Sequence, residues 1–454
     1  MTILVVSTVV RWLTLSATAA VLGALVVGVF VLPRAVPARP AKRLRRWTTA
    51  AAIVLLLGSV AELILRTQAM AGSSSAALLA GVPVVVAKTH FGRVWLVRAG
   101  AIVMLLLLTS RSSRRARGAA LVLAAIVALT TALTGHLSDW GDLTPSVGLD
   151  WAHVMAAGTW TGGLAALALA TAGLGGPVWE VSALTTVAGR FSRLAGYCLL
   201  VAVLTGIYNA WVQMPGVAAF WTTGYGRVLG IKVLVVMALA ALGCVNRYGV
   251  VVRLGAGSPR SPIARMFRRA RLIAAGPAGP RAALPARFVT YLTAEAGLAV
   301  VVLACTAALG ESTPARHAVH LDHHPVSEPA GPVRVTMDAL HAQGGVPSNW
   351  LFTPPGGDVA RGRALFSTLQ CYACHTVNGE GFPTPTGPGP DLTGMGEHHP
   401  AGYLAESILN PNAVIVEGPG YTGPDGRSTM PDYREHLSLA DFIDLVAYLK
   451  SLRE

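Results

Sequence analysis

Charged residues are scarce in this chain. Only 13% of its 454 residues are Asp, Glu, Lys or Arg, whereas 53% are hydrophobic, and the mean hydropathy is +0.54. Soluble domains usually carry about 25% charged residues. The composition therefore excludes an ordinary soluble enzyme and indicates a polytopic membrane protein.

Acidic residues are missing mainly from one part of the chain. Residues 1–330 hold 29 Lys and Arg against 9 Asp and Glu, whereas residues 331–454 hold 7 against 13. The formal net charge of +14 thus belongs to the hydrophobic part. Clustered arginines between apolar runs are typical of membrane topology rather than of phosphate contacts, so we expect no nucleic-acid partner.

Cysteines are also few. Of the five, Cys198, Cys244 and Cys305 lie inside apolar runs, which leaves no disulfide framework to propose. The first apolar run is too long for a cleaved secretory signal and lacks a basic start. No Gly-rich loop precedes a helix with the Lys or acidic partner of a nucleotide site, and nothing resembles a hydrolase.

Eight apolar runs are long enough to cross the roughly 30 Å hydrocarbon core of a membrane. They cover residues 12–33, 47–65, 91–109, 118–136, 149–172, 191–213, 228–246 and 288–310. The segment 67–90 is also apolar, but Gly72, Gly81 and Pro83 interrupt it. We expect a re-entrant or surface segment there, with a ninth span as the alternative.

Basic residues mark alternate loops between these runs. Loops 34–46 and 111–117 are rich in arginine, and loop 247–287 holds nine arginines. With eight spans, every basic loop falls on the cytoplasmic side and both termini face the periplasm, whereas nine spans would break the alternation. The sequence therefore predicts a protein of the bacterial inner (cytoplasmic) membrane.

Residues 371–375 read CYACH, which places Cys371, Cys374 and His375 in a Cys-x-x-Cys-His motif. Such a motif attaches a c-type haem: two thiols form thioethers with the vinyl groups, and the His becomes the proximal iron ligand. A chance thiol pair or half of a zinc site is the alternative. Haem attachment takes place outside the cytoplasm, which agrees with the predicted side of the C-terminal domain.

Two amphipathic helices frame this motif. Residues 358–369 precede it, and apolar residues at helical spacing follow between 437 and 449. This order resembles a class I cytochrome c, an all-α domain in which the two helices cross. The resemblance implies a Met as distal ligand, and we favour Met430 over Met395, with His398 and His399 as weaker alternatives.

Several polar residues interrupt the apolar runs. By the predicted topology, Glu62, Arg98, His136, Asp150, His153, Asn209 and Lys232 fall in the periplasmic half, with His90 at its edge, whereas Glu295 lies nearer the cytoplasm. Asp150 and His153 share a helix face. With His136 and His90 they suit a copper site open to the periplasm. A haem b ligated by two imidazoles and plain hydrogen-bonded histidines are the alternatives.

Further residues suit copper. The linker ARHAVHLDHHP carries His317, His320, His323 and His324, and a His-rich tract of this kind binds copper or zinc or is simply solvated. Cys198 and Cys244 lie in the predicted cytoplasmic half, where thiolates would suit Cu(I), although buried cysteines also serve as small apolar side chains.

Longer phrases carry a family resemblance over most of residues 10–315. They are THFGRVWLVRAG (89–100), TGH (134–136), DWAHVMAAGTWTGGL (150–164), RFSRLAGYCLLVAVLTGIYNAW (190–211), YGRVLGIKVLVVMALAALGCVNR (225–247) and RFVTYLTAEAGLAVVVLACTAAL (287–309). Their order and spacing resemble the CopD-type copper-resistance membrane family. The resemblance implies copper handling, since the family is associated with copper uptake across the inner membrane. Its members commonly stand alone or follow a copper-binding periplasmic domain, so a fused cytochrome departs from the pattern.

The sequence thus predicts a mostly α chain: an eight-helix membrane domain (1–310), a His-rich periplasmic linker (311–332) and a periplasmic cytochrome c domain (333–454). The leading function is membrane-bound electron transfer between haem c and copper, in an electron carrier rather than a stand-alone enzyme. The alternatives are a membrane-anchor subunit of a respiratory complex with haem b, and a copper importer with a reducing cytochrome. Redox proteins of the periplasm or membrane are the expected partners.

Overall fold

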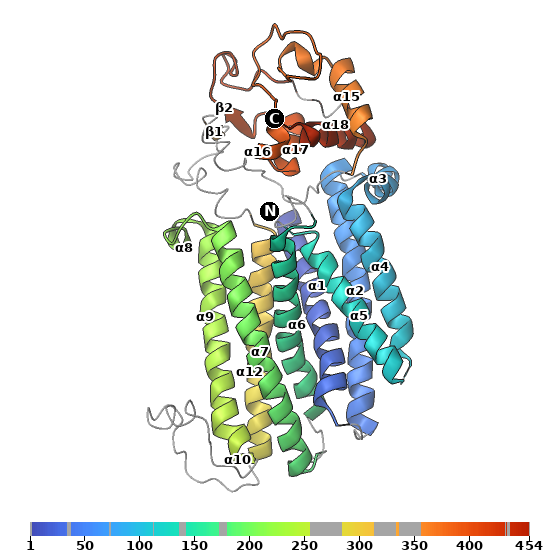
Figure 1. The fold of residues 1–454 in the computed structure, drawn as a ribbon, viewed down its shortest axis with the longest axis vertical. Coiled ribbons are helices and arrows are strands. Elements are labelled where there is room, and N and C mark those ends of the chain that lie inside the picture. The colour runs from blue at the N-terminus through green and yellow to red at the C-terminus, as the bar shows by residue number, and fades with distance from the viewer. Residues whose placement is uncertain are drawn as a thin grey trace.

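The fold is a bundle of long, nearly parallel helices with a smaller helical domain at one end (Figure 1). The computed structural model describes residues 2–33, 38–71, 74–111, 113–135, 142–171, 179–254, 284–312, 333–335, 356–431, 433 and 436–453. The N-terminus lies at the same end of the bundle as the C-terminal domain, and α10 (Val252–Leu254) lies at the opposite end. This arrangement agrees with the predicted even number of spans.

Eight helices of the described chain are long and apolar enough to cross a membrane, as predicted. They are α1 (Thr2–Val26, continued by the π-helical turn Val27–Val31), α2 (Ala38–Ala71), α4 (His90–Thr109), α5 (Arg114–Ala132), α6 (Pro145–Thr171), α7 (Val181–Gln213), α9 (Gly224–Val245, continued by the π-helical turn Asn246–Val251) and α12 (Leu284–Gly310). Helix α2 starts well before the predicted 47, because arginine and lysine are good helix formers that extend a span beyond the hydrocarbon.

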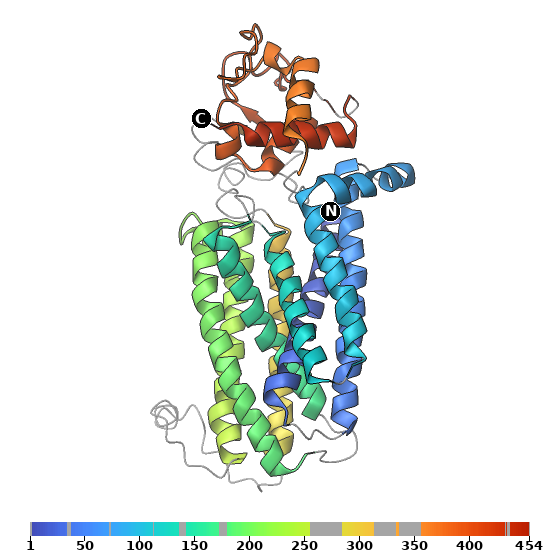
Figure 2. The ribbon, with the colours of Figure 1, turned by 45° about the vertical axis from the view of Figure 1, so that its right-hand side comes forward.

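The interrupted segment 67–90 does not form one element. Its first residues complete α2, and Ser74 then caps α3 (Ser75–Lys88) by accepting a hydrogen bond from the Ala77 amide. At 14 residues, α3 is about 21 Å long, too short for the hydrocarbon core. It runs crosswise to the other helices and projects from the edge of the bundle, at the end that carries the C-terminal domain (Figure 2). This position favours the predicted surface segment over a ninth span.

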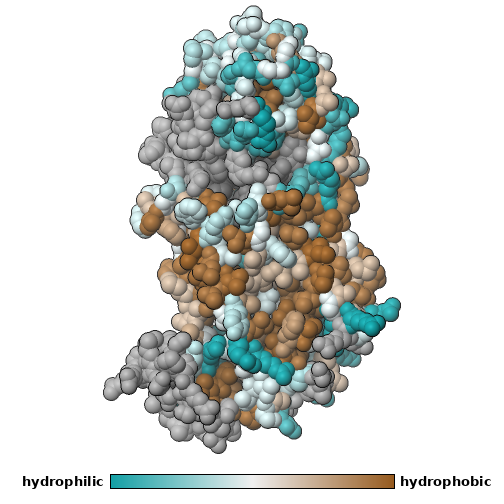
Figure 3. Space-filling model, viewed as in Figure 1, coloured by the Kyte–Doolittle hydropathy of each residue, from teal (hydrophilic) through white to brown (hydrophobic). Residues whose placement is uncertain are grey.

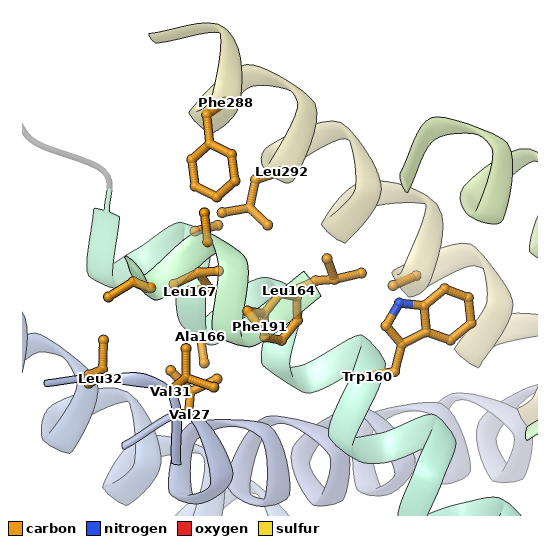
Figure 4. Close-up of a cluster of buried hydrophobic side chains, with 14 of the residues drawn as sticks. Val27, Val31, Leu32, Trp160, Leu164, Ala166, Leu167, Phe191, Phe288 and Leu292 are labelled. Atoms are coloured by element: carbon orange, nitrogen blue, oxygen red, sulfur yellow. The ribbon is translucent and has the colours of Figure 1, made fainter. Parts of the chain in front are cut away.

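Small residues let α1 and α6 meet closely at the centre of the bundle. A Cβ on Gly162 would lie 1.7 Å from the Ala19 carbonyl oxygen, so only glycine fits there. Further along, larger side chains fill the core. Val27 of the π-helical turn after α1 lies there with side chains of α6, α7 and α12, namely Leu164, Phe191, Phe288 and Leu292 (Figure 4). This packing supplies the dispersion contacts that hold helices together in lipid.

The outer surface of the bundle is apolar. Figure 3 shows hydrophobic residues gathered over the middle of the molecule, with hydrophilic residues towards both ends. Exposed large hydrophobics such as Leu57, Leu107, Leu204 and Leu234 belong to this surface. A soluble monomer rarely leaves so large an apolar area exposed, and lipid is the environment that suits it.

The C-terminal domain contains α15 (Val359–Thr368), the 3-10 turn Cys371–Ala373, α16 (Met395–His398), α17 (Ala401–Leu409) and α18 (Leu439–Ser451). Helices α15 and α18 cross as predicted: a Cβ on Gly362 would lie 2.0 Å from the Asp444 carbonyl oxygen, and Phe366 and Tyr448 pack with ring centroids 5.5 Å apart.

One element was not predicted. The strands β1 (Val333–Val335) and β2 (Val414–Val416) pair in parallel, a short addition to a chain that is mostly α-helical, as predicted. Each strand has only three residues, too few for an alternation of apolar and polar residues to show in the sequence.

The two domains meet at α3. The Lys88 ammonium lies 2.8 Å from the carboxylate of Asp444, a residue of α18 with no exposed surface. The Gly356 amide donates to the Lys88 carbonyl at 3.0 Å, and Leu439 packs beside Val85 and Phe91. Helix α3 therefore seats the C-terminal domain on the bundle.

Candidate functional site

The motif CYACH begins directly after α15. Gln370 adopts a left-handed conformation (φ 55°), which ends the helix and starts the 3-10 turn that contains Cys371. The His375 amide donates to the Cys371 carbonyl at 3.0 Å. Cys371 and Cys374 are half-buried free thiols on this turn, and burial raises the pKa of Cys371 to about 11.

The ring of His375 is held by its backbone surroundings. Its Nδ1 lies 2.9 Å from the Pro390 carbonyl oxygen, so Nδ1–H is the donor. Burial lowers the pKa of His375, which favours the neutral ring. Such a ring presents Nε2 as a metal ligand, because the hydrogen bond at one nitrogen selects the nitrogen that binds.

Glycines in the following loop allow the chain to pass close to the motif. A Cβ on Gly387 would lie 2.6 Å from the Cys374 sulfur, and one on Gly389 would lie 2.4 Å from the Cys374 carbonyl oxygen. The amides of Thr386 and Gly387 both donate to the Ala373 carbonyl, at 3.0 and 2.8 Å. The loop that carries Pro390 is thereby fixed against the motif.

The two methionines lie in different surroundings. Met430 is half-buried and packs against the same core cluster as Cys371. Its loop is fixed where the Ser428 amide donates to Asn412 at 2.9 Å. Met395 is only 4% exposed and begins α16, which packs on the last turn of α18, where Lys450 Nζ donates to the Gly396 carbonyl.

The weaker histidine alternatives lie with Met395. His398 ends α16, and His399 follows it, fully buried against Tyr403 with ring centroids 4.8 Å apart. The Lys450 ammonium also donates to the His399 carbonyl at 2.8 Å, which ties this segment to the end of α18.

The donor set suits a covalent haem. The chain offers two free thiols, an imidazole with its Nδ1 engaged and a half-buried thioether, and Cys371 and Met430 pack against the same apolar core cluster. Tyr433 is a residue that the sequence did not single out. Burial raises the pKa of its phenol, and proximity to Cys371 and Cys374 adds to the increase. Its only sequence signal is its position three residues after Met430.

Asp150 and His153 share one face of α6, as predicted, and both meet α7. Asn209 donates its amide to the Asp150 carboxylate at 2.9 Å, and His153 Nδ1 lies 2.9 Å from the Thr205 hydroxyl. Thr205 and Asn209 are four apart and so occupy one face of α7. Helix α6 begins at Pro145, at the end of the bundle that carries the C-terminal domain (Figure 1), and Asp150 and His153 belong to its first three turns.

The other predicted metal ligands are only partly described. His90 begins α4, and its Nε2 lies 2.8 Å from Asp142, a carboxylate that the sequence did not single out. A Cβ on Gly135 would lie 3.9 Å from the Asp150 carboxylate. His136 and the linker residues His317, His320, His323 and His324 lie outside the described residues. Within the described ranges, no three His, Cys, Asp or Glu side chains form a metal cluster.

The predicted cytoplasmic half holds a separate polar pair. Asn246 donates to the Glu295 carboxylate at 2.8 Å between the π-helical turn after α9 and α12. Cys198 belongs to the main hydrophobic core and is 8% exposed, so it serves as a packing residue.

A bundle of eight membrane-length helices joined to a domain around a Cys-x-x-Cys-His motif defines an integral membrane cytochrome. Family models identify the domains of which the chain is made. The model for the copper resistance protein D-like N-terminal domain matches residues 1–143, that for copper resistance protein D matches 185–309, and that for cytochrome c matches 359–453. The chain is thus a fusion of copper resistance D domains with a C-terminal cytochrome c domain, as the resemblances predicted.

Two relatives support this composition. The chain is 27% identical over 214 residues to the copper transport protein CutJ of Bacillus subtilis (strain 168), covering 45% of this chain and 39% of that protein. It is 29% identical over 277 residues to copper resistance protein D of Pseudomonas syringae pv. tomato, covering 59% of this chain and 83% of that protein. The chain therefore spans well under half of the CutJ protein. No solved structure matches the chain.

Proposed function

We propose that this protein transfers single electrons between a periplasmic haem c and copper held by the membrane bundle. The observation that carries the proposal is the fusion itself: a cytochrome c domain, which implies covalent haem c, is seated on α3 of a copper resistance D bundle. The proposed units are 1–310, 311–332 and 333–454. The chain would lie in the bacterial inner membrane with eight spans, and both termini and the haem domain would face the periplasm.

The haem would be held by four residues. Cys371 and Cys374 would form the thioethers, His375 would bind iron through Nε2, and Met430 would be the distal ligand. The haem supplies a one-electron Fe(III)/Fe(II) couple, and a thioether ligand raises its potential. Pro390 fixes the orientation of the imidazole, and the Phe366–Tyr448 core excludes water from one side of the site.

Copper would bind at the end of the bundle nearest to the haem domain. Asp150 and His153 provide a carboxylate and an imidazole on one face of α6, and His136, which follows Gly135 near Asp150, would join them. His90, now paired with Asp142, is the fourth proposed ligand. The linker histidines 317, 320, 323 and 324 would form a second, exposed site.

The electron balance is simple. With haem c held by Cys371, Cys374 and His375, the domain would supply one electron for the reduction of one Cu(II) to Cu(I), and a redox protein of the periplasm or membrane would return that electron. A copper importer with a reducing cytochrome uses the same step. The family models that match the chain are those of copper resistance D and cytochrome c, and none of them supports the haem b alternative.

A pyridine haemochrome spectrum combined with a metal assay tests the proposal. We expect haem c as the sole haem, together with copper, in the purified protein. A haem b contribution that disappears in a His136→Ala/His153→Ala variant would show that these residues bind haem rather than copper, and it would overturn the proposal.

Copper stoichiometry separates the two proposed copper sites. We expect the His136→Ala/His153→Ala variant to lose copper that a deletion of residues 316–325 retains. Loss of all copper in the deletion alone would place copper on the linker and exclude the membrane site.

A further inference from the structure

Helix α3 has no polar face. Between Ser75 and Lys88, its two end residues, every residue is apolar or glycine. A helix that is apolar on all sides is stable only when it is buried in protein or surrounded by lipid. None of the proposed haem or copper ligands belongs to α3.

Protein covers one side of α3. Gly81, Val84 and Lys88 lie on this side, because they are three or four residues apart. A Cβ on Gly81 would lie 2.9 Å from Thr67 of α2 and 3.4 Å from Leu439 of α18. Val84 packs against the core cluster of the haem domain, and the Lys88 ammonium binds a carboxylate of α18 at 2.8 Å. This side is therefore filled by α2 and the haem domain.

The opposite side of α3 is exposed. Its exposed residues recur at helical spacing and are all apolar: Ala76, Leu79, Ala80, Pro83 and Ala87. Leu79, at the centre of this side, is 79% exposed. Water is an unfavourable environment for a helix side that carries no polar group.

Helix α3 lies at the edge of the span formed by α4. Helix α4 has 20 residues and is about 30 Å long, which equals the thickness of the hydrocarbon core. Thr89 alone separates the end of α3 from the start of α4. Exposed apolar side chains appear on α4 about two turns from its start, at Leu96 (51%) and Val97 (56%). The crosswise helix seen in Figure 2 therefore lies where the membrane begins.

We propose that α3 lies in the membrane interface, with its exposed side against the boundary between lipid headgroups and acyl chains. Lipid is the occupant because this side continues the apolar surface of α4, which already faces lipid. The only charge of α3, on Lys88, is bound to the haem domain, so the contact needs no anionic headgroup. The haem domain, packed on the other side of the helix, is thereby held at the membrane surface. The inference requires only the membrane bundle and is independent of the proposed copper function.

Electron paramagnetic resonance of a nitroxide label tests this placement. The label is attached to Leu79→Cys in the haem-loaded full chain, with the substitutions C198A, C244A and C305A, in nanodiscs of zwitterionic phosphatidylcholine. Molecular oxygen concentrates in lipid, whereas a nickel chelate stays in water, so their relative collision rates report the surroundings of the label. We expect oxygen to relax the label at position 79 more strongly than the nickel chelate does. The same chain without the added cysteine gives the signal to subtract.

Two further labels calibrate the result. Leu204→Cys lies on the exposed apolar surface of α7, where Leu204 is 60% exposed, and Glu417→Cys replaces an exposed residue of the haem domain. The ratio of oxygen to nickel collisions at position 79 should be several-fold higher than at position 417 and approach that at position 204. A ratio equal to that at position 417 would place the exposed side in water. Loss of both kinds of collision would show that a second copy of the chain covers it, and either result would overturn the proposal.

Discussion

At the scale of single residues, backbone contacts select the chemistry of the haem site. The Pro390 carbonyl engages Nδ1 of His375, so that Nε2 would be the nitrogen that binds iron. Gly387 and Gly389 bring the loop that carries Pro390 against Cys374. Met430 shares its apolar surroundings with Cys371, whereas Met395 is buried at the end of α18. These surroundings distinguish the two methionines, which the sequence alone separates only by position.

The first prediction follows from this difference. Met430→Ala should abolish the weak near-infrared Met–Fe(III) absorption band and lower the midpoint potential, because a thioether ligand is lost. Met395→Ala should keep both properties and only destabilise the domain, by about 2–5 kcal/mol, through a cavity in the core. Redox titration followed by absorption measures both. Exchange of the two outcomes would make Met395 the ligand.

At the scale of elements, α18 holds the haem domain together through its contacts with α15, and it binds the domain to the bundle through α3. Ser438 caps its first turn by accepting a hydrogen bond from the Asp441 amide at 3.2 Å. The Ser438 hydroxyl is the main cause that lowers the pKa of Asp441 below its usual value of 3.8, and the Arg361 guanidinium is the second. Asp444, one turn later, binds Lys88 of α3, the Asp358 amide and the Arg361 guanidinium.

The second prediction concerns the cap. Ser438→Ala should reduce the free energy of unfolding of the haem domain by about 1 kcal/mol, measured by denaturant titration of the Soret band. A carboxyl group whose pKa is lowered by folding stabilises the folded state at pH values above its pKa in the unfolded chain. This stabilisation is lost as the pH falls through the pKa of the folded state. The deficit of the variant should therefore be largest at neutral pH and shrink below about pH 4. A deficit that stays constant at acid pH would show that Asp441 gains nothing from the cap.

The third prediction concerns the seat of the haem domain on α3. Lys88→Ala removes a charge partner of a fully buried carboxylate and should lower the stability of the haem domain by about 1–3 kcal/mol, since two other donors to Asp444 remain. Arg361→Ala, with a side chain 57% exposed, should cost about 0–1 kcal/mol. Equal losses in thermal unfolding of the full chain would contradict the role of α3.

The sequence could predict those features that depend on local pattern. The eight apolar runs, the CYACH motif, the terminal helix and the shared face of Asp150 and His153 all follow from spacing within one segment. It could not predict the Arg98–Glu62 pair, the His90–Asp142 pair or the Gly162–Ala19 contact, because each joins segments far apart in the chain. The strands β1 and β2 were missed because each has only three residues, too few for an alternation of apolar and polar residues to show.

At the scale of the whole molecule, the distribution of basic residues and the arrangement of the helices indicate the same orientation in the membrane. The haem domain and the N-terminus lie at one end of the bundle, and α10 lies at the other end. Helix α10 belongs to the arginine-rich segment 247–287. Basic loops stay in the cytoplasm, so the haem domain would face the periplasm, where haem c is attached.

The fourth prediction tests this orientation. A reporter that is active only in the cytoplasm should be inactive when fused after Glu454, and one that is active only in the periplasm should be active there. The same reporters placed within 255–283 should give the opposite pattern, which serves as the internal control. Cytoplasmic activity at the C-terminus would reverse the topology.

Stopped-flow mixing of the reduced full chain with Cu(II) tests the central claim most directly. We expect one equivalent of Cu(II) to oxidise one equivalent of haem. The rate should fall by at least about tenfold in an Asp150→Asn/His153→Gln variant, because the metal is held less tightly. The rate should be retained when residues 316–325 are deleted. If reduced haem is not oxidised by Cu(II), or the double variant reacts as fast as the native chain, haem and copper are not coupled through this site.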